Sequence, residues 1–144
     1  MKATISFHFQ HPSFRLRHRQ LLRQWLLRCT HAEGQGIASL RYLFCTDEHI
    51  LEANNQFLQH DYYTDILTFG DHSAAGISGD ILISIDRVRD NAKTHGTKPI
   101  DELHRVMSHG ALHLLGHSDH TPEQQQAMRA KEDAWLAQRP AFNA

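Results

Sequence analysis

The chain has 144 residues and a formal net charge of −1, with 40% hydrophobic and 22% charged residues. This length and composition are typical of a single globular domain and argue against a disordered or fibrous protein. Because the net charge is close to zero, an overall basic field cannot attract a nucleic acid, and such a partner would need a local basic patch.

Hydrophobic periodicity predicts four strands and five or six helices along the chain. Apolar residues alternate with polar ones in the first strand, at Ile5, Phe7 and Phe9, whereas residues 66–69 and 81–83 are short apolar runs. In the first helix, apolar residues recur at helical spacing, with Leu22, Trp25 and Leu26 on one stripe. The segment from Gly70 to Gly79 is small and polar and is expected to be a loop. In chain order we expect a strand at 5–9, a helix at about 14–30, a strand at 37–45, a helix at about 47–57, short strands at 66–69 and 81–83, and helices at about 85–93, 99–115 and 121–137.

This order predicts an α+β fold in a single domain over residues 1–144, with a mixed sheet of about four strands and a metal site at the end of a helix. No apolar run reaches the roughly 20 residues that cross a bilayer, and the N-terminus lacks the layout of a signal peptide. Cys29 and Cys45 are the two cysteines of the sequence and form no recognisable spacing pattern, so neither a disulfide framework nor a cysteine metal site is indicated. We therefore expect a cytoplasmic protein without a membrane partner. The oligomeric state is not indicated.

Histidine is unusually common, with 13 in the chain, and five of them lie between His104 and His120. His109 and His113 are four residues apart on a predicted helix, so they lie on one face. Gly116 is expected to end that helix, and Asp119 and His120 follow it. Two imidazoles at this spacing can bind one Zn²⁺, and a third ligand shortly after the glycine would leave a coordination position open for water. This pattern predicts a catalytic metal site.

Three neighbouring positions limit what that site can do. Zinc proteases carry a glutamate directly after the first histidine as general base, but this chain has Gly110 there, which disfavours peptidase activity. We therefore assign no protein base and expect a metal-bound water to be the nucleophile. His104 lies on another face of the helix and His117 follows the glycine too closely, so neither is expected to be a ligand.

The segment from His109 to Gly116, HGALHLLG, resembles the hallmark of the YbeY family of bacterial endoribonucleases. Residues 61–69 (DYYTDILTF), 79–84 (GDILIS) and 128–136 (MRAKEDAWL) resemble three further family segments in the same order. The resemblance implies a mixed four-stranded sheet and a metal-dependent hydrolase that cuts single-stranded RNA. It also implies a role in 3′-end maturation of small-subunit (16S) ribosomal RNA and in ribosome quality control, with ribosomal RNA and the small ribosomal subunit as partners.

The chain departs from the family pattern at the third metal ligand. The family motif ends Gly-Tyr-Asp-His, with its last histidine ten residues after the first. Here Asp119 is ten residues after His109, and the nearest histidine, His120, is one residue further. Register favours Asp119, and a bulge in the loop would instead bring in His120. The cofactor is expected to be one Zn²⁺ per chain, although another divalent metal would suit the same ligands.

A second departure concerns the residues that would hold RNA. Leu58 stands where family members often have an arginine that is thought to act on the RNA phosphate, and His60 is a nearby candidate to replace it. Arg15, Arg19 and Arg23 are spaced by four on the predicted first helix and would form a basic stripe for RNA phosphates; a solvated helix face explains the same spacing. The alternative function is a non-catalytic binding factor in ribosome maturation with a structural metal.

Overall fold

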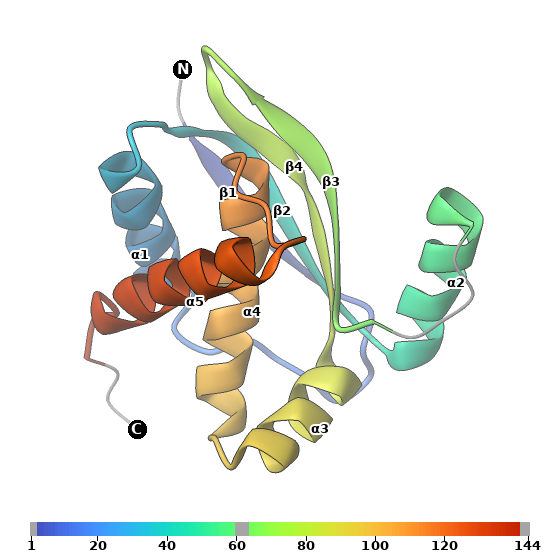
Figure 1. Ribbon diagram of the computed structural model, residues 1–144. Helices are drawn as coiled ribbons and strands as arrows, with labels where there is room; N and C mark the ends of the chain where they lie inside the picture. The colour runs from blue at the N-terminus through green and yellow to red at the C-terminus, as the bar shows by residue number, and fades with distance from the viewer. Residues whose placement is uncertain (1–2, 60–63, 142–144) are drawn as a thin grey trace.

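The computed structural model describes residues 3–59 and 64–141. These residues form an α+β fold with five helices and one four-stranded mixed sheet, which confirms the predicted fold class and element order (Figure 1). The strands are β1 (Thr4–Phe9), β2 (Ile37–Cys45), β3 (Ile66–Ser73) and β4 (Gly76–Ser84); the helices are α1 (Arg19–Ala32), α2 (Asp47–Leu58), α3 (Ile85–His95), α4 (Pro99–Leu114) and α5 (Pro122–Ala137).

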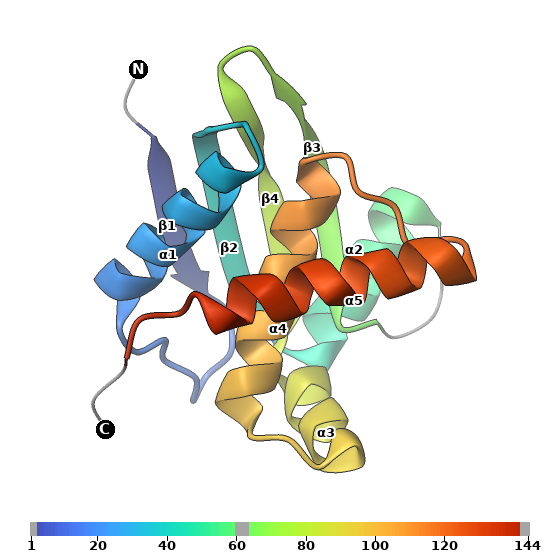
Figure 2. The same cartoon turned by 60° about the vertical axis from the view of Figure 1, so that its left-hand side comes forward.

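The sheet has the strand order β1-β2-β4-β3. The first three of these strands are mutually parallel, and β3 runs antiparallel to β4 along one edge. Helices α1, α4 and α5 cover one face, where the main hydrophobic core lies, whereas α2 packs on the opposite face over a smaller apolar cluster (Figures 1 and 2). Helix α5 crosses over α4 (Figure 2), and this crossing brings Glu132 of α5 to His109 of α4.

Helix α4 packs closely against the sheet, and Gly110 makes this approach possible. A Cβ atom at Gly110 would lie 2.8 Å from Cγ2 of Ile81 and 3.0 Å from Cδ1 of Ile66, which is closer than carbon atoms normally approach. The hydroxyl of the buried Tyr42 donates a hydrogen bond of 2.9 Å to the carbonyl oxygen of Met107, which ties the middle of the helix to β2. The position that carries the general base in zinc proteases therefore faces the core here and has no room for a glutamate.

Two predicted boundaries are wrong. The first helix begins at Arg19 rather than near residue 14, because Leu16 turns into the core from an irregular segment that precedes the helix. The expected loop from Gly70 to Gly79 is instead a hairpin, in which β3 continues to Ser73 and β4 begins at Gly76. The exposed end of this hairpin has few apolar side chains, so backbone pairing forms it without a hydrophobic signal in the sequence.

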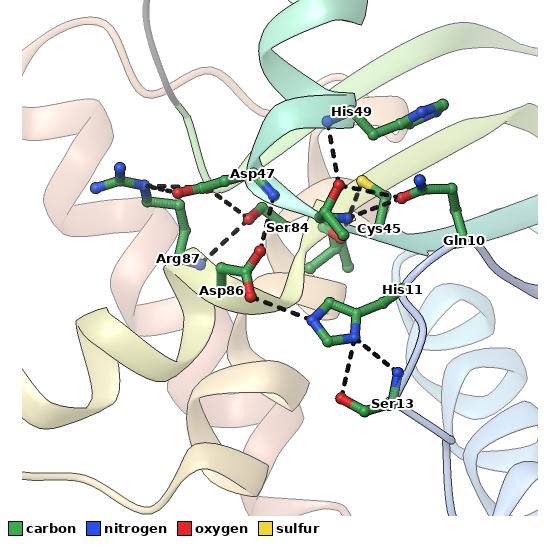
Figure 3. Close-up of polar contacts among 11 residues, drawn as sticks. Gln10, His11, Ser13, Cys45, Asp47, His49, Ser84, Asp86 and Arg87 are labelled. Atoms are coloured by element: carbon green, nitrogen blue, oxygen red, sulfur yellow. Dashed lines mark hydrogen bonds and ion pairs between the residues drawn. The ribbon is translucent and has the colours of Figure 1, made fainter.

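A polar network joins the carboxyl ends of the three parallel strands (Figure 3). Asp86 accepts hydrogen bonds from the backbone N–H of Asp47 at 2.9 Å and from Nε2 of His11 at 3.1 Å. Ser84, the N-cap of α3, donates to Asp47 at 2.8 Å, and Arg87 pairs with the same carboxylate at 3.1 Å. Asp86 of α3 thus accepts from the first backbone N–H of α2, and side chains of both first turns bond to each other, which ties the two helices together.

No helix in the described ranges has both the length and the apolar character that a membrane span requires.

Candidate metal centre

Helix α4 places His109 and His113 side by side, as their four-residue spacing predicts. Their Nε2 atoms lie 3.0 Å apart and their ring centroids 4.5 Å apart. Both side chains are about three-quarters buried, with exposed fractions of 23% and 26%. The two rings therefore present nitrogen atoms to one point at the side of the helix, as ligands of a shared metal ion must.

Asp119 reaches the same point from the loop between α4 and α5. Its Oδ2 lies 3.2 Å from Nε2 of His109 and 3.4 Å from Nε2 of His113. Gly116, with a φ of 103°, follows the last turn of α4 in the left-handed region. The loop after α4 then leads away from the end of that helix to the start of α5 (Figure 2). Within the described residues, His109, His113 and Asp119 are the one group of three potential ligands whose donor atoms come within 4.8 Å of one another.

His120, the alternative third ligand, lies elsewhere. Its side chain is exposed and its backbone N–H donates to Oε1 of Gln124 at the start of α5. It is not part of the group formed by His109, His113 and Asp119. The loop therefore directs Asp119 toward the histidine pair and His120 away from it.

Glu132 on α5 hydrogen-bonds to His109 on the side of the ring that faces away from Asp119 and His113. Its Oε2 accepts a hydrogen bond of 2.7 Å from Nδ1 of His109, and its Oε1 accepts one of 3.0 Å from Arg105. A carboxylate can only accept, so Nδ1 of His109 carries the hydrogen and Nε2 is left to face Asp119 and His113. Carboxylates in this role fix the ring orientation of metal-binding histidines. Glu132 was not predicted as a site residue, although it lies in the segment MRAKEDAWL that resembles the family. The sequence did contain a hint, since Glu132 is a charged residue on the apolar face of its helix.

Electrostatics in the metal-free site favour a charged His109. Burial lowers the pKa of His109, but the hydrogen bond and negative charge of Glu132, together with Asp119 and Asp65, outweigh burial and raise it. Burial also raises the pKa of Asp65. The negative charges of Glu132, Asp119 and Asp65 would stabilise a metal cation in the same way as they stabilise a proton on His109. The metal cation and the proton would therefore compete for this histidine.

A cavity of about 280 Å³ opens beside His109. It is lined by Asp65, Glu102, Arg105, His109, Arg129 and Glu132, with Ile66 and Val106 as apolar walls. The exposed Arg129 is a cation on the rim, whereas Arg105 is engaged by Glu132 and Asp133. The cavity thus offers a charged recess next to His109, on the side where Glu132 contacts that ring.

The two histidines that were not expected to be ligands have other partners. His104 is buried, its Nδ1 lies 2.9 Å from Arg139, and burial lowers its pKa to about 4. His117 pairs with Glu33 at 2.7 Å. Neither belongs to the group of potential ligands.

The predicted RNA-binding residues do not gather at this cavity. Arg15 precedes α1, while Arg19 and Arg23 lie on it and stack over Phe9 and Phe7 of β1 at 4.8 and 5.0 Å. None of these three arginines lines the cavity beside His109. Leu58 is 42% exposed at the end of α2. The prediction for His60 falls outside the described residues.

Comparisons with known proteins point to one family. A family profile described as "Endoribonuclease YbeY" matches residues 5–139. Proteins named Endoribonuclease YbeY are similar to the chain: one from Cytophaga hutchinsonii is 49% identical over 96% of this chain and 97% of its own length, and one from Porphyromonas gingivalis is 43% identical over 93% and 89%. A solution structure of a Thermotoga maritima protein matches with a TM-score of 0.62 at 24% identity, over 90% of this chain and 86% of that one, and so supports the fold.

Proposed function

Because the chain belongs to the YbeY family of endoribonucleases, we propose that it is a zinc-dependent enzyme that cuts single-stranded RNA. The observation that carries metal dependence is the convergence of His109, His113 and Asp119 on one point. We extend the proposal to 3′-end maturation of 16S ribosomal RNA and ribosome quality control, with the small ribosomal subunit as partner, in the cytoplasm. The whole chain, residues 1–144, would act as one metal-dependent hydrolase domain.

The donor set suits Zn²⁺. Zinc binds imidazole nitrogen and carboxylate oxygen, and three protein ligands are typical of its catalytic sites. Nε2 of both histidines and Oδ2 of Asp119 already face one another, and Glu132 orients His109 from behind. When bound, the ion would activate water for attack and stabilise negative charge on the scissile phosphate.

The residues around the site would prepare it for a phosphodiester substrate. Arg129 on the rim of the cavity could attract and orient an RNA phosphate, a role that Leu58 cannot fill. Glu132 prevents the ring of His109 from rotating, since its carboxylate is 7% exposed and fixed on its other oxygen by Arg105. The recess of about 280 Å³ would receive a nucleotide unit beside His109.

The decisive experiment combines elemental analysis with RNA cleavage. Wild type should bind about one equivalent of zinc and cut single-stranded RNA, and a chelator should abolish cleavage. His113→Ala and Asp119→Ala should lose metal and activity while remaining folded, whereas His120→Ala, the matched control one residue away, should keep both. Loss of metal in His120→Ala alone would assign the third position to histidine. Cleavage by metal-free His113→Ala would refute the proposed mechanism.

One observation favours the alternative of a binding factor with a structural metal: the exposed Leu58 occupies the place of the family arginine. On that alternative, wild type would bind zinc and bind RNA without cutting it, and removal of the metal would lower the melting temperature with no activity to lose. The same cleavage assay therefore separates the two functions.

A further inference from the structure

The loop that carries Asp119 is held at both of its ends. At the end of α4, the backbone N–H of His117 donates to the carbonyl oxygen of Leu112 at 3.1 Å. At the start of α5, Thr121 and Gln124 form a reciprocal capping box. Only Ser118, Asp119 and His120 lie between these two anchors, so a small shift of either anchor would displace the Asp119 carboxylate.

The side chain of His117 adds a third anchor, from a distant part of the chain. Its Nε2 lies 2.7 Å from Oε1 of Glu33, the residue that directly follows α1. The other oxygen of Glu33 accepts a hydrogen bond of 2.9 Å from Lys131 on α5. The Glu33 side chain is 17% exposed and that of His117 is 33% exposed, so this pair is better shielded from water than an ordinary surface ion pair.

We infer that His117, held by Glu33, is a positioning residue that keeps Asp119 directed at His109 and His113; this inference rests on the proposed metal function. His117 itself does not belong to the group of potential ligands, so it acts through the loop and not on the metal. The side chain of aspartate reaches less far from its Cα than that of histidine. A site that uses aspartate as third ligand therefore depends more strongly on where the backbone of the loop lies.

A hydrogen-bond donor at the place of Nε2 should matter more than the imidazole itself. His117→Leu removes the donor, whereas His117→Gln keeps an N–H group at a similar distance from the backbone. His31→Leu is a matched control, since this histidine is exposed near the end of α1, close in sequence to Glu33.

The test is titration of the metal-free full-length protein with Co²⁺, followed by the visible absorption of the bound ion, which reports coordination geometry as well as affinity. We expect His117→Leu to bind Co²⁺ about tenfold more weakly, the usual scale for a residue that orients a metal ligand, with an altered spectrum. His117→Gln should recover most of the affinity, and His31→Leu should match wild type. Asp119→Ala keeps both histidines and should bind Co²⁺ only weakly, at a large excess of metal; in that background, His117→Leu should weaken the residual binding no further.

Two results would overturn the inference. In the first, His117→Leu binds Co²⁺ with the affinity and spectrum of wild type. In the second, His117→Leu weakens binding equally with and without Asp119, which would mean that it acts on the fold as a whole; thermal unfolding of the metal-free variants checks the same point. Failure of wild type itself to bind Co²⁺ or Zn²⁺ is a different outcome, which refutes the proposed function and the inference with it.

Discussion

Replacement of Glu132 by glutamine tests whether the carboxylate behind His109 prepares the metal site. Glu132 accepts hydrogen bonds at both oxygens, from Nδ1 of His109 at 2.7 Å and from Arg105 at 3.0 Å. A glutamine has one acceptor oxygen, so its amide NH₂ group must face a donor at one of the two contacts. Glu132→Gln therefore leaves either the imidazole or the guanidinium without its partner in a largely buried position.

The size of the effect follows from these contacts. Loss of a charge-assisted hydrogen bond in a buried site costs about 1–3 kcal/mol. If the His109 contact is lost, zinc affinity should fall about 10–100-fold, the range measured for partners that orient metal-binding histidines. The loss of negative charge also lowers the pKa of His109, which reduces proton competition, so zinc affinity is measured at pH 8, where proton competition is weaker than at neutral pH in both proteins.

Competition with a fluorescent zinc chelator at pH 8 provides the affinity, and urea unfolding of the metal-free protein provides the stability. Asp133→Asn is the matched control, because Asp133 is the next residue on α5, is 61% exposed and pairs with the same Arg105 at 2.6 Å. We expect Asp133→Asn to bind zinc like wild type. If Glu132→Gln binds zinc as tightly as Asp133→Asn does, Glu132 does not prepare the metal site and the reasoning fails.

Three further predictions concern the core. Tyr42→Phe removes the hydrogen bond to the carbonyl of Met107 and should lower the free energy of unfolding in urea by about 1–2 kcal/mol; an unchanged urea midpoint would contradict this. Burial lowers the pKa of His104 from 6.5 to about 4, so the unfolded chain takes up a proton first and stability falls as pH drops through this window. Between these two pH values, protonation of His104 should lower the free energy of unfolding of wild type by about 3 kcal/mol. The free energy of unfolding of His104→Gln should depend less on pH, and equal pH dependence in the two proteins would contradict this prediction. Gly110→Ala places a methyl group 2.8 Å from Ile81. Overpacking costs about 1–3 kcal/mol, whereas the better helix propensity of alanine contributes about 1 kcal/mol, so the melting temperature should fall or stay level. A clear rise in melting temperature would show that α4 does not pack tightly against the sheet at this position.

Local patterns in the sequence were sufficient for most of the fold. The alternation around Ile5 and Phe7, the apolar stripes and the capping box at Thr121 and Gln124 all act over a few residues, and the structure confirms the order of elements that they predict. The histidine pair could be placed on one helix face for the same reason, since four residues make about one turn. A boundary failed where side chains carry no apolar pattern, as in the hairpin of β3 and β4 between Gly70 and Gly79, whose strands are joined by backbone pairing.

Local spacing by itself determined that this chain has a helix with His109 and His113 on one face, followed by a glycine turn and an acidic residue. Only the tertiary structure decided that Asp119 and not His120 turns toward the pair, that Glu132 comes from α5 to hold His109, and that Glu33 reaches the loop from α1. The contacts of Glu132 and Glu33 join residues far apart in sequence. Their geometry depends on how α5 crosses α4 and how both helices pack on the sheet, and no short sequence window records the relative placement of such elements.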